Sequence, residues 1–348
     1  MSDRPGADEL HGMDLLDASS IRSLHPLGAE AVAVPAAVRE ALIEDGGDPA
    51  WLDAVPALAA RAAERWDLVL GAPFETGMAG WTAEATTAAG HDVVLKLSYP
   101  HLEARDEAAG LTAWHGLGAV EVLAADAEDW ALLLARLRPG TTLRDEGLPP
   151  EEHVAVGAAV LARMHAVAVP AGEPFRSLVE VADRLADIAV ERIERLLPTA
   201  PIPVDAGLCR QAVDLLRTLP RSATRRGLAH GDLNPGNILR ADTAADGWLA
   251  IDPKPVHGDL AWDPWPLVTQ VEDWTEHVAE PAVLADRIRL VAELTGLDAG
   301  RIGAWCVARG VESGLWSADL GRWTGFRGAD TDLAWAGAWA KATDLLAR

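Results

Sequence analysis

The stretch from residue 230 to residue 252 constrains the fold more than any other part of this 348-residue chain. Two short apolar runs, 238–240 and 248–251, flank a polar segment at 241–247 that ends in Asp-Gly. Short apolar runs separated by a polar turn with Asp-Gly are typical of a β-hairpin. The sequence therefore predicts two antiparallel strands here, in a chain whose neighbouring regions look mainly helical.

Three polar side chains are expected at the open end of this hairpin. The residue that opens the first strand lies opposite the residue that closes the second, so Asn237 and Asp252 should meet, with Asp232 on the loop just before them. An amide oxygen with one or two carboxylates can hold Mg²⁺ together with phosphate oxygens, and a further carboxylate can accept a proton from an attacking hydroxyl. Each residue taken alone is more typical of an ordinary turn. Their order, with the hairpin between them, favours a phosphate-transfer site.

Composition narrows the partners. The chain has 53 acidic and 30 basic residues, a net charge of −23, and 49% hydrophobic residues. Such a charge argues against nucleic acid or an anionic membrane as a main partner. It suits a cationic ligand, although the solubility of an acidic protein explains it as well. The two cysteines show no metal-binding spacing, and no segment reads as a signal peptide or membrane span, so we expect a reduced, cytoplasmic protein.

The order of the expected elements predicts an α+β protein with two lobes. Residues 1–30 should form a mobile extension, followed by an N-terminal lobe at 31–137 and a mainly helical C-terminal lobe at 138–348. Within the N-terminal lobe, Asp48 and Pro49 mark the start of a helix that runs to about Trp66. The remaining expected elements are a helix at 35–44, strands at 67–71, 81–87 and 92–98, a helix at 101–115, and strands at 119–124 and 130–137.

Lys96 lies inside an apolar strand, Val93 to Leu97. A buried ammonium needs a partner, and the helix that follows offers one. Glu107 shares a helical stripe with two large apolar residues and should face inward, while Glu103 lies on the same face and competes for the role. The alternative is an edge-strand lysine whose ammonium reaches solvent.

The loop at 71–80 is rich in glycine but lacks the G-x-G-x-x-G pattern, so it indicates phosphate binding only weakly. The absence of a Gly-Lys-Ser/Thr sequence excludes a P-loop enzyme. The strand at 130–137 enters a Pro-Gly turn at 139–140, where backbone groups could meet a nucleotide base.

Together these motifs resemble the aminoglycoside and hydroxyurea phosphotransferase family, and most of all its streptomycin 6-kinase branch. The resemblance is carried, in order, by Val-Val-Leu-Lys at 93–96, Glu107, Leu-Leu-Leu…Arg-Pro-Gly at 132–140, His-Gly-Asp…Asn at 230–237 and Ile-Asp-Pro-Lys at 251–254. It implies a bilobal protein-kinase-like fold, with a small lobe of five antiparallel strands plus a helix and a large, mainly helical lobe. It also implies an enzyme that transfers phosphate to a hydroxyl from ATP, with GTP as the alternative donor.

The family pattern assigns roles to individual residues. Asp232 would be the catalytic base, and Asn237 and Asp252 would hold Mg²⁺. Lys96, oriented by Glu107, would bind the α- and β-phosphates.

Further roles follow from the same resemblance. Ala135 and Leu137 would lie beside the nucleotide base, although the family often has Glu at the position of Ala135. His230 would brace the loop, Asp259 would be its structural partner, and Lys254 could contact either a phosphate or an acidic neighbour.

The acceptor is less defined. Acidic and aromatic residues of the C-terminal part would suit a cationic or sugar-like small molecule. Composition alone favours tryptophans that pack helices and acids that face water. The residues are Glu272, Asp273, Trp274, Glu276, Trp316, Asp319, Trp323, Asp330, Asp332 and Trp335. We expect phosphorylation of an aminoglycoside-like antibiotic. The alternatives are a kinase for hydroxyurea, an amino sugar, or a peptide or nucleoside antibiotic, a non-catalytic nucleotide-binding protein, and a metal-dependent phosphohydrolase.

Overall fold

The structure is a computed structural model that describes residues 32–44, 46–75, 80–172, 174–271, 277–325 and 328–347. The chain divides into two compact units. The first unit comprises the chain up to Gly116 together with Val120–Arg138, and the second comprises Leu117–Ala119 together with Pro139–Arg348. The expected N-terminal extension, 1–30, and residues 76–79 of the glycine-containing loop lie outside the described residues.

The first unit opens with two helices, α1 (Ala36–Glu44) and α2 (Pro49–Trp66). The start of α2 is the predicted one: the Asp48 carboxylate accepts a hydrogen bond of 2.8 Å from the N–H of Ala50, and Pro49 occupies the first turn. The helix ends at Asp67, which adopts a left-handed conformation with φ of 51°. Both ends are therefore set by local sequence.

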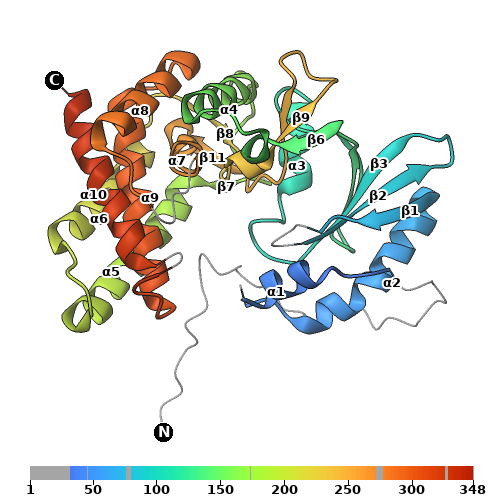
Figure 1. The fold of residues 1–348 in the computed structure, drawn as a ribbon, viewed down its shortest axis with the longest axis horizontal. Coiled ribbons are helices and arrows are strands. Elements are labelled where there is room, and N and C mark those ends of the chain that lie inside the picture. The colour runs from blue at the N-terminus through green and yellow to red at the C-terminus, as the bar shows by residue number, and fades with distance from the viewer. Residues whose placement is uncertain are drawn as a thin grey trace, which may run out of the picture. The chain divides into compact units, whose positions relative to one another are not determined.

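A five-stranded sheet follows, and all its strand pairs are antiparallel. Its spatial order is β1-β2-β3-β5-β4. Figure 1 labels β1, β2 and β3 of this sheet. The strands are β1 (Leu68–Pro73), β2 (Gly80–Thr87), β3 (Asp92–Ser98), β4 (Val122–Asp126) and β5 (Ala131–Ala135), with α3 (Glu107–Trp114) between β3 and β4. This confirms the predicted small lobe of five antiparallel strands plus a helix.

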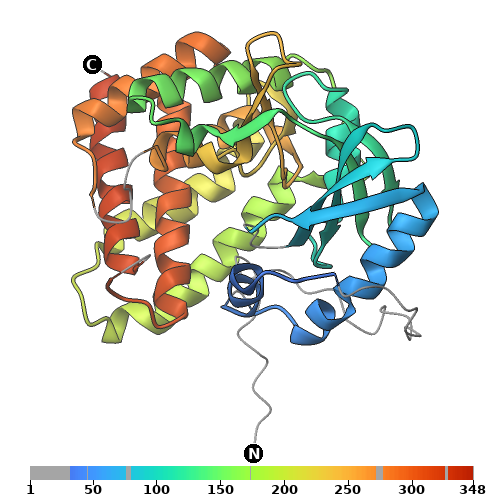
Figure 2. The ribbon, with the colours of Figure 1, turned by 45° about the vertical axis from the view of Figure 1, so that its right-hand side comes forward.

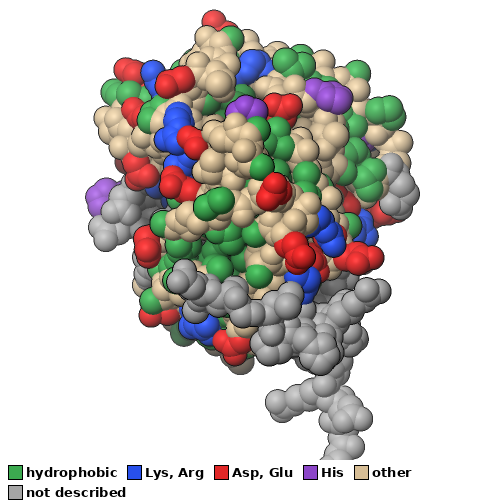
Figure 3. Space-filling view, turned by 90° about the vertical axis from the view of Figure 1, so that its right-hand side faces the viewer, with side chains coloured by type: hydrophobic (Ala, Val, Ile, Leu, Met, Phe, Trp, Pro, Cys, Tyr) green, Lys and Arg blue, Asp and Glu red, His purple; other side chains and the backbone are tan. Residues whose placement is uncertain are grey.

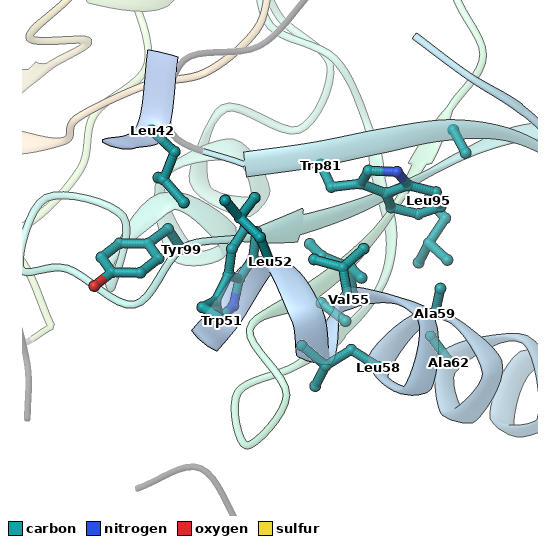
Figure 4. Packing of buried hydrophobic residues seen from close by; sticks show 13 residues of the cluster. Leu42, Trp51, Leu52, Val55, Leu58, Ala59, Ala62, Trp81, Leu95 and Tyr99 are labelled. Carbon is teal, nitrogen blue, oxygen red and sulfur yellow. The ribbon is translucent and has the colours of Figure 1, made fainter. Parts of the chain in front are cut away.

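Helix α2 covers one face of this sheet. Its apolar side chains, among them Trp51, Leu52 and Val55, pack against Trp81 and Leu95 of the strands (Figure 4). Because side chains alternate along a strand, the residue after Leu95 points to the opposite face. The packing of α2 therefore directs Lys96 away from the apolar core cluster.

The helix predicted at 101–115 is shorter than expected, since α3 begins only at Glu107. Residues 101–106 form turns instead, closed by hydrogen bonds from Ala104 N–H to His101 O and from Glu107 N–H to Ala104 O, both 3.2 Å. These bonds span three residues and not the four of an α-helix. The Arg105 side chain also binds the Asp106 carboxylate within the same turn.

The second unit is mainly helical, as predicted. Its α-helices are α4 (Pro150–His165), α5 (Leu178–Leu196), α6 (Ala206–Thr218), α7 (Pro264–Thr269), α8 (Pro281–Thr295), α9 (Ala299–Asp319) and α10 (Ala329–Leu346). Its 3₁₀-helices are η2 (Leu143–Glu146), η3 (Leu197–Thr199), η4 (Pro220–Ser222), η5 (Pro235–Asn237) and η6 (Leu260–Trp262). Helices α9 and α10 pack along each other (Figure 2).

Two small sheets of the second unit frame the loop at 230–237. One sheet has the order β10-β9-β6 and the other β7-β11-β8. The strands are β6 (Pro139–Thr142), β7 (Arg176–Ser177), β8 (Arg226–Ala229), β9 (Ile238–Ala241), β10 (Trp248–Ala250) and β11 (Val256–Asp259). The loop therefore leaves β8, passes through η5 and enters β9.

Acidic and basic side chains lie next to one another on the face shown in Figure 3. Among the ion pairs of the first unit are Arg136–Glu84, at 2.8 Å, and Arg138–Asp92. Both cysteines are free and buried, and burial raises the pKa of the Cys209 thiol to about 11. Among the described residues, no helix combines the length and the apolar character that a bilayer crossing requires.

Candidate active site

Lys96 and Glu107 form the predicted pair in the first unit. The Lys96 ammonium lies 2.6 Å from Glu107 Oε1, and the two residues are only 7% and 3% exposed. Ser98 Oγ donates to the other carboxylate oxygen at 3.3 Å. Strand β3 lies between β2 and β5, so Lys96 is not an edge-strand lysine. Of the two candidate glutamates, it is Glu107 that forms this ion pair.

The predicted hairpin is confirmed in the second unit. Strands β9 and β10 are antiparallel, with Ile238 opposite Ala250. Beyond this pair, Ile251 N–H donates a hydrogen bond of 2.9 Å to Asn237 O. Asn237 therefore lies opposite Ile251, and Asp252 is the next residue along. We predicted that Asn237 would lie opposite Asp252. The register of the hairpin places Asn237 opposite Ile251 instead, one residue earlier.

His230 braces the loop from inside. It is completely buried, its Nδ1 accepts the N–H of Asp232 at 3.2 Å, and its Nε2 lies 3.0 Å from Ile251 O. Since Nδ1 accepts, the ring carries its proton on Nε2 and donates to Ile251. Burial lowers the pKa of His230, against the opposing charges of Asp263, Asp232 and Asp252. A neutral, fixed imidazole is what the bracing role requires.

The Asp232 side chain is held at the loop surface. It is 29% exposed, its Oδ1 accepts from Asn234 Nδ2 at 3.3 Å, and its backbone oxygen accepts from Asn237 Nδ2 at 2.9 Å. The amide nitrogen of Asn237 is thus committed to the loop, which leaves its oxygen as the end that can bind a cation. Asp252 adopts a left-handed conformation with φ of 55°, an unusual state that often occurs at functional sites.

The carboxylate that anchors the loop backbone is Asp263, not the predicted Asp259. Asp263 Oδ2 accepts from the N–H of His230 at 2.9 Å, and Oδ1 accepts from the N–H of Gly231 at 2.7 Å. His165 Nε2 lies 2.8 Å from Asp263 Oδ2, and both side chains are buried. Burial alone would raise the pKa of Asp263, but the His165 hydrogen bond and charge lower it, and the net shift is downward.

Asp259 instead holds helix α9. Its Oδ2 accepts from Arg301 Nε and from Trp305 Nε1, both at 2.6 Å. The two carboxylates are four residues apart, and β11 with η6 directs them to different neighbours.

Arg309 of α9 is a second anchor that the sequence analysis did not identify. Its guanidinium lies 4.1 Å from the ring centroid of Trp262 and 4.4 Å from that of Trp265, and it donates to Gly231 O at 3.4 Å. Burial lowers the pKa of Arg309 to about 10, so it remains charged at neutral pH. The charges of Asp232 and Asp263 oppose this shift. The loop is therefore backed by a buried cation.

Ala135 and Leu137, expected beside the nucleotide base, belong to the first unit. Ala135 ends β5 opposite Val93, and its N–H donates to Glu121 O at 3.0 Å. Leu137 is buried, 6% exposed, just after the strand.

Several expected acceptor residues serve packing in the second unit. Asp319 binds Arg192 at 3.0 Å and Arg195 at 2.5 Å. Asp332 accepts from two serines of α9, and Trp335 is buried against Trp339. These three side chains have structural partners within the helices that carry them or pack on them. Glu272, Asp273, Trp274 and Glu276 lie outside the described residues.

Comparison with known proteins identifies the family. The model of the aminoglycoside/hydroxyurea antibiotic resistance kinase family matches residues 65–321, a range that includes the Lys96–Glu107 pair and the whole 230–252 stretch. This chain belongs to that family. As an antibiotic resistance kinase it is a phosphotransferase, which takes its phosphoryl group from a nucleotide donor and passes it to a small-molecule acceptor.

Two relatives illustrate the range of this kinase family. The chain is 32% identical to streptomycin 6-kinase from Streptomyces griseus over 293 residues, covering 83% of this chain and 92% of that protein. It is 33% identical to hydroxyurea phosphotransferase from Kitasatospora aureofaciens over 297 residues, covering 83% and 82%. The resemblance predicted from the motifs is therefore confirmed.

A solved structure confirms the fold of the kinase. Choline kinase from Streptococcus pneumoniae matches with a TM-score of 0.55 over 81% of this chain and 99% of that one, at 15% sequence identity. An identity this low supports the shared architecture and not a shared substrate. The protein-kinase-like fold was predicted from the order of the motifs.

Proposed function

We propose that this kinase phosphorylates a hydroxyl of an aminoglycoside-like antibiotic of the streptomycin type, with Mg-ATP as the donor. The observation that carries the proposal is the second-unit loop, in which buried anchors hold the backbone while the Asp232 carboxylate stays 29% exposed. The similarity of the chain to two streptomycin 6-kinases, each 32% identical, favours this acceptor class.

Each candidate residue has a role in this proposal. Asp232 accepts the proton of the acceptor hydroxyl as the new oxygen–phosphorus bond forms. Lys96, kept in place by Glu107, binds the α- and β-phosphates, while the backbone around Ala135 and Leu137 contacts the base. Catalysis in such a site consists mostly of positioning and charge compensation.

Magnesium would bind to Asn237 and Asp252. An amide oxygen and one carboxylate fit an ion that uses few protein ligands and completes its shell with phosphate oxygens and water. When bound, the ion would neutralise phosphate charge. GTP is an alternative donor, because the contacts expected near the base are backbone groups.

A kinase for hydroxyurea is the second candidate, favoured by the similarity to hydroxyurea phosphotransferase at 33% identity. The net charge of −23 supports a cationic acceptor over neutral hydroxyurea. An amino sugar, or a peptide or nucleoside antibiotic, completes the set of acceptors to be compared.

The test is nucleotide consumption by the purified protein with magnesium and a panel of these acceptors. We expect turnover with streptomycin-type aminoglycosides, and loss of at least about 10²-fold in Asp232→Asn. The control is Asp242→Asn, an exposed carboxylate at the far end of the same hairpin. Nucleotide consumption with hydroxyurea, together with no consumption above background with any aminoglycoside, would refute an aminoglycoside as the acceptor. Full activity in Asp232→Asn would refute the role of Asp232 as base.

A further inference from the structure

Lys254 lies two residues after Asp252, and its backbone is fixed on both sides. Its N–H donates to His230 O at 2.8 Å. Its carbonyl oxygen lies so close to Gly231 that a Cβ at that position would overlap it, and Gly231 has a φ of +85°. The backbone of Lys254 is therefore locked to the start of the loop at 230–237.

The side chain of Lys254 reaches the Asp232 carboxylate at the surface of the loop. It is 42% exposed, and its ammonium lies 3.6 Å from Asp232 Oδ2, longer than an ordinary hydrogen bond. The other oxygen of Asp232 accepts from Asn234. One oxygen of the candidate base thus has a structural amide partner, and the other faces a cation on a flexible stem. A half-exposed pair at this distance contributes little to stability.

We propose that Lys254 is a catalytic residue that binds the phosphoryl group while it is transferred. This inference rests on the proposed function. The acceptor oxygen bonds to phosphorus, the bond from phosphorus to the leaving nucleoside diphosphate breaks, and the acceptor proton moves to Asp232. Before that proton moves, negative charge on the three non-bridging phosphoryl oxygens lies next to the still ionised Asp232 carboxylate. The Lys254 ammonium offsets the repulsion between these two groups.

Lysine suits this task better than a buried arginine would. An ammonium on four methylenes moves from the carboxylate to a phosphate oxygen without changing the backbone. The locked backbone keeps the stem pointed at Asp232, and the exposed ammonium can follow the phosphoryl group.

The test uses Lys254→Met and Lys254→Arg, with Lys341→Met as the control. The chain has only three lysines, and Lys341 is exposed on α10. In Lys254→Met we expect kcat to fall by about 10²-fold or more with little change in the acceptor KM. Lys254→Arg should recover part of the rate, and the midpoint of thermal unfolding should match wild type in every variant.

Binding provides a second readout that a structural role would not move. Lys254→Met should weaken binding of a non-hydrolysable triphosphate analogue with magnesium by about tenfold and leave binding of the diphosphate unchanged. In wild type, the triphosphate should protect Lys254, but not Lys341, from acetylation, as read by mass spectrometry.

Three results would overturn the inference: a kcat within about twofold of wild type in Lys254→Met, equal weakening of both nucleotides, or a lowered unfolding midpoint that accounts for the lost rate. If wild type binds the triphosphate but turns over no acceptor, the binding comparison still decides the role of Lys254. If wild type binds neither nucleotide, the proposed function fails, and this role fails with it.

Discussion

Replacing Asp263 by Asn should loosen the catalytic loop while leaving the protein folded. Three donors converge on the two oxygens of Asp263: the N–H groups of His230 and Gly231, at 2.9 and 2.7 Å, and His165 Nε2 at 2.8 Å. Asparagine has one oxygen, so its amide nitrogen must face at least one of these donors. A hydrogen bond to a charged group contributes about 1.5–3 kcal/mol, and breaking a buried ionic pair costs about 3–5 kcal/mol. We expect a loss of about 3 kcal/mol, less than the stability of a typical domain.

The same change should reduce turnover through the position of Asp232, one residue beyond the anchored amides. A displacement of about 1 Å costs about 10²-fold in rate. Two measurements apply: the free energy of unfolding in urea, and hydrogen exchange at the amides of residues 230 and 231. Both amides should exchange faster in the variant.

Asp259→Asn is the matched control. Asp259 is also buried and accepts from Arg301 and Trp305 at 2.6 Å, but neither partner belongs to the loop. We expect a similar loss of stability with the amides of residues 230 and 231 still protected. If Asp263→Asn left these amides as protected as in wild type, or if both variants lost the same share of kcat, the anchoring argument would be wrong.

Three further predictions concern single residues. Glu107→Gln leaves the Lys96 ammonium buried without its carboxylate, so the free energy of unfolding should fall by about 3 kcal/mol, and the double change Lys96→Met with Glu107→Leu should recover much of it without restoring turnover. The lowered pKa of His230 means that the unfolded chain takes up this proton at a higher pH than the folded one; stability should therefore fall as pH drops below about 6.5, by up to about 1.4 kcal/mol per unit, and His230→Gln should flatten that slope. Gly231→Ala places a Cβ against a backbone carbonyl at positive φ and should destabilise by about 1–3 kcal/mol or more, whereas Gly247→Ala, also at positive φ, meets only a side chain at ordinary contact distance and should lose less.

Urea unfolding checks all three. A Glu107→Gln variant as stable as wild type would contradict the buried pair, and an unchanged pH slope in His230→Gln would contradict the neutral imidazole. Equal losses in the two glycine variants would show that positive φ, and not the close approach, determines the need for glycine.

The sequence predicted what local chemistry determines. The cap at Asp48, the apolar strand around Lys96, the stripe that turns Glu107 inward and the Asp-Gly turn of the hairpin all depend on residues within about one element of each other. Predictions from such patterns agree with the folded structure because the interacting residues are close in sequence. The order of the motifs along the chain predicted the fold, because it resembles the order found in the antibiotic kinase family, which has the protein-kinase-like fold.

The missed features depend on contacts between distant residues. Asp259 and Asp263 look alike in sequence, and only the paths of β11 and η6 decide that the second anchors the loop. A hint was available, because Asp263 follows Trp262 and precedes Pro264 and Trp265, an apolar setting in which a carboxylate needs donors. Arg309, which donates to Gly231 O from helix α9, gave no comparable signal in the sequence. The early start predicted for α3 failed because helical periodicity cannot detect turns closed by bonds spanning three residues.

The anchoring of the loop from both directions along the chain has a consequence for the order in which the protein is made. His165 emerges from the ribosome before the loop, but Asp263 and Arg309 emerge after it. A nascent chain that stops short of α9 would contain the candidate residues from Lys96 to Lys254 and still lack the buried cation that backs Gly231. The chain therefore becomes catalytically active only late in synthesis. Truncation near residue 298 should yield a polypeptide with the complete 230–252 stretch and no catalytic activity.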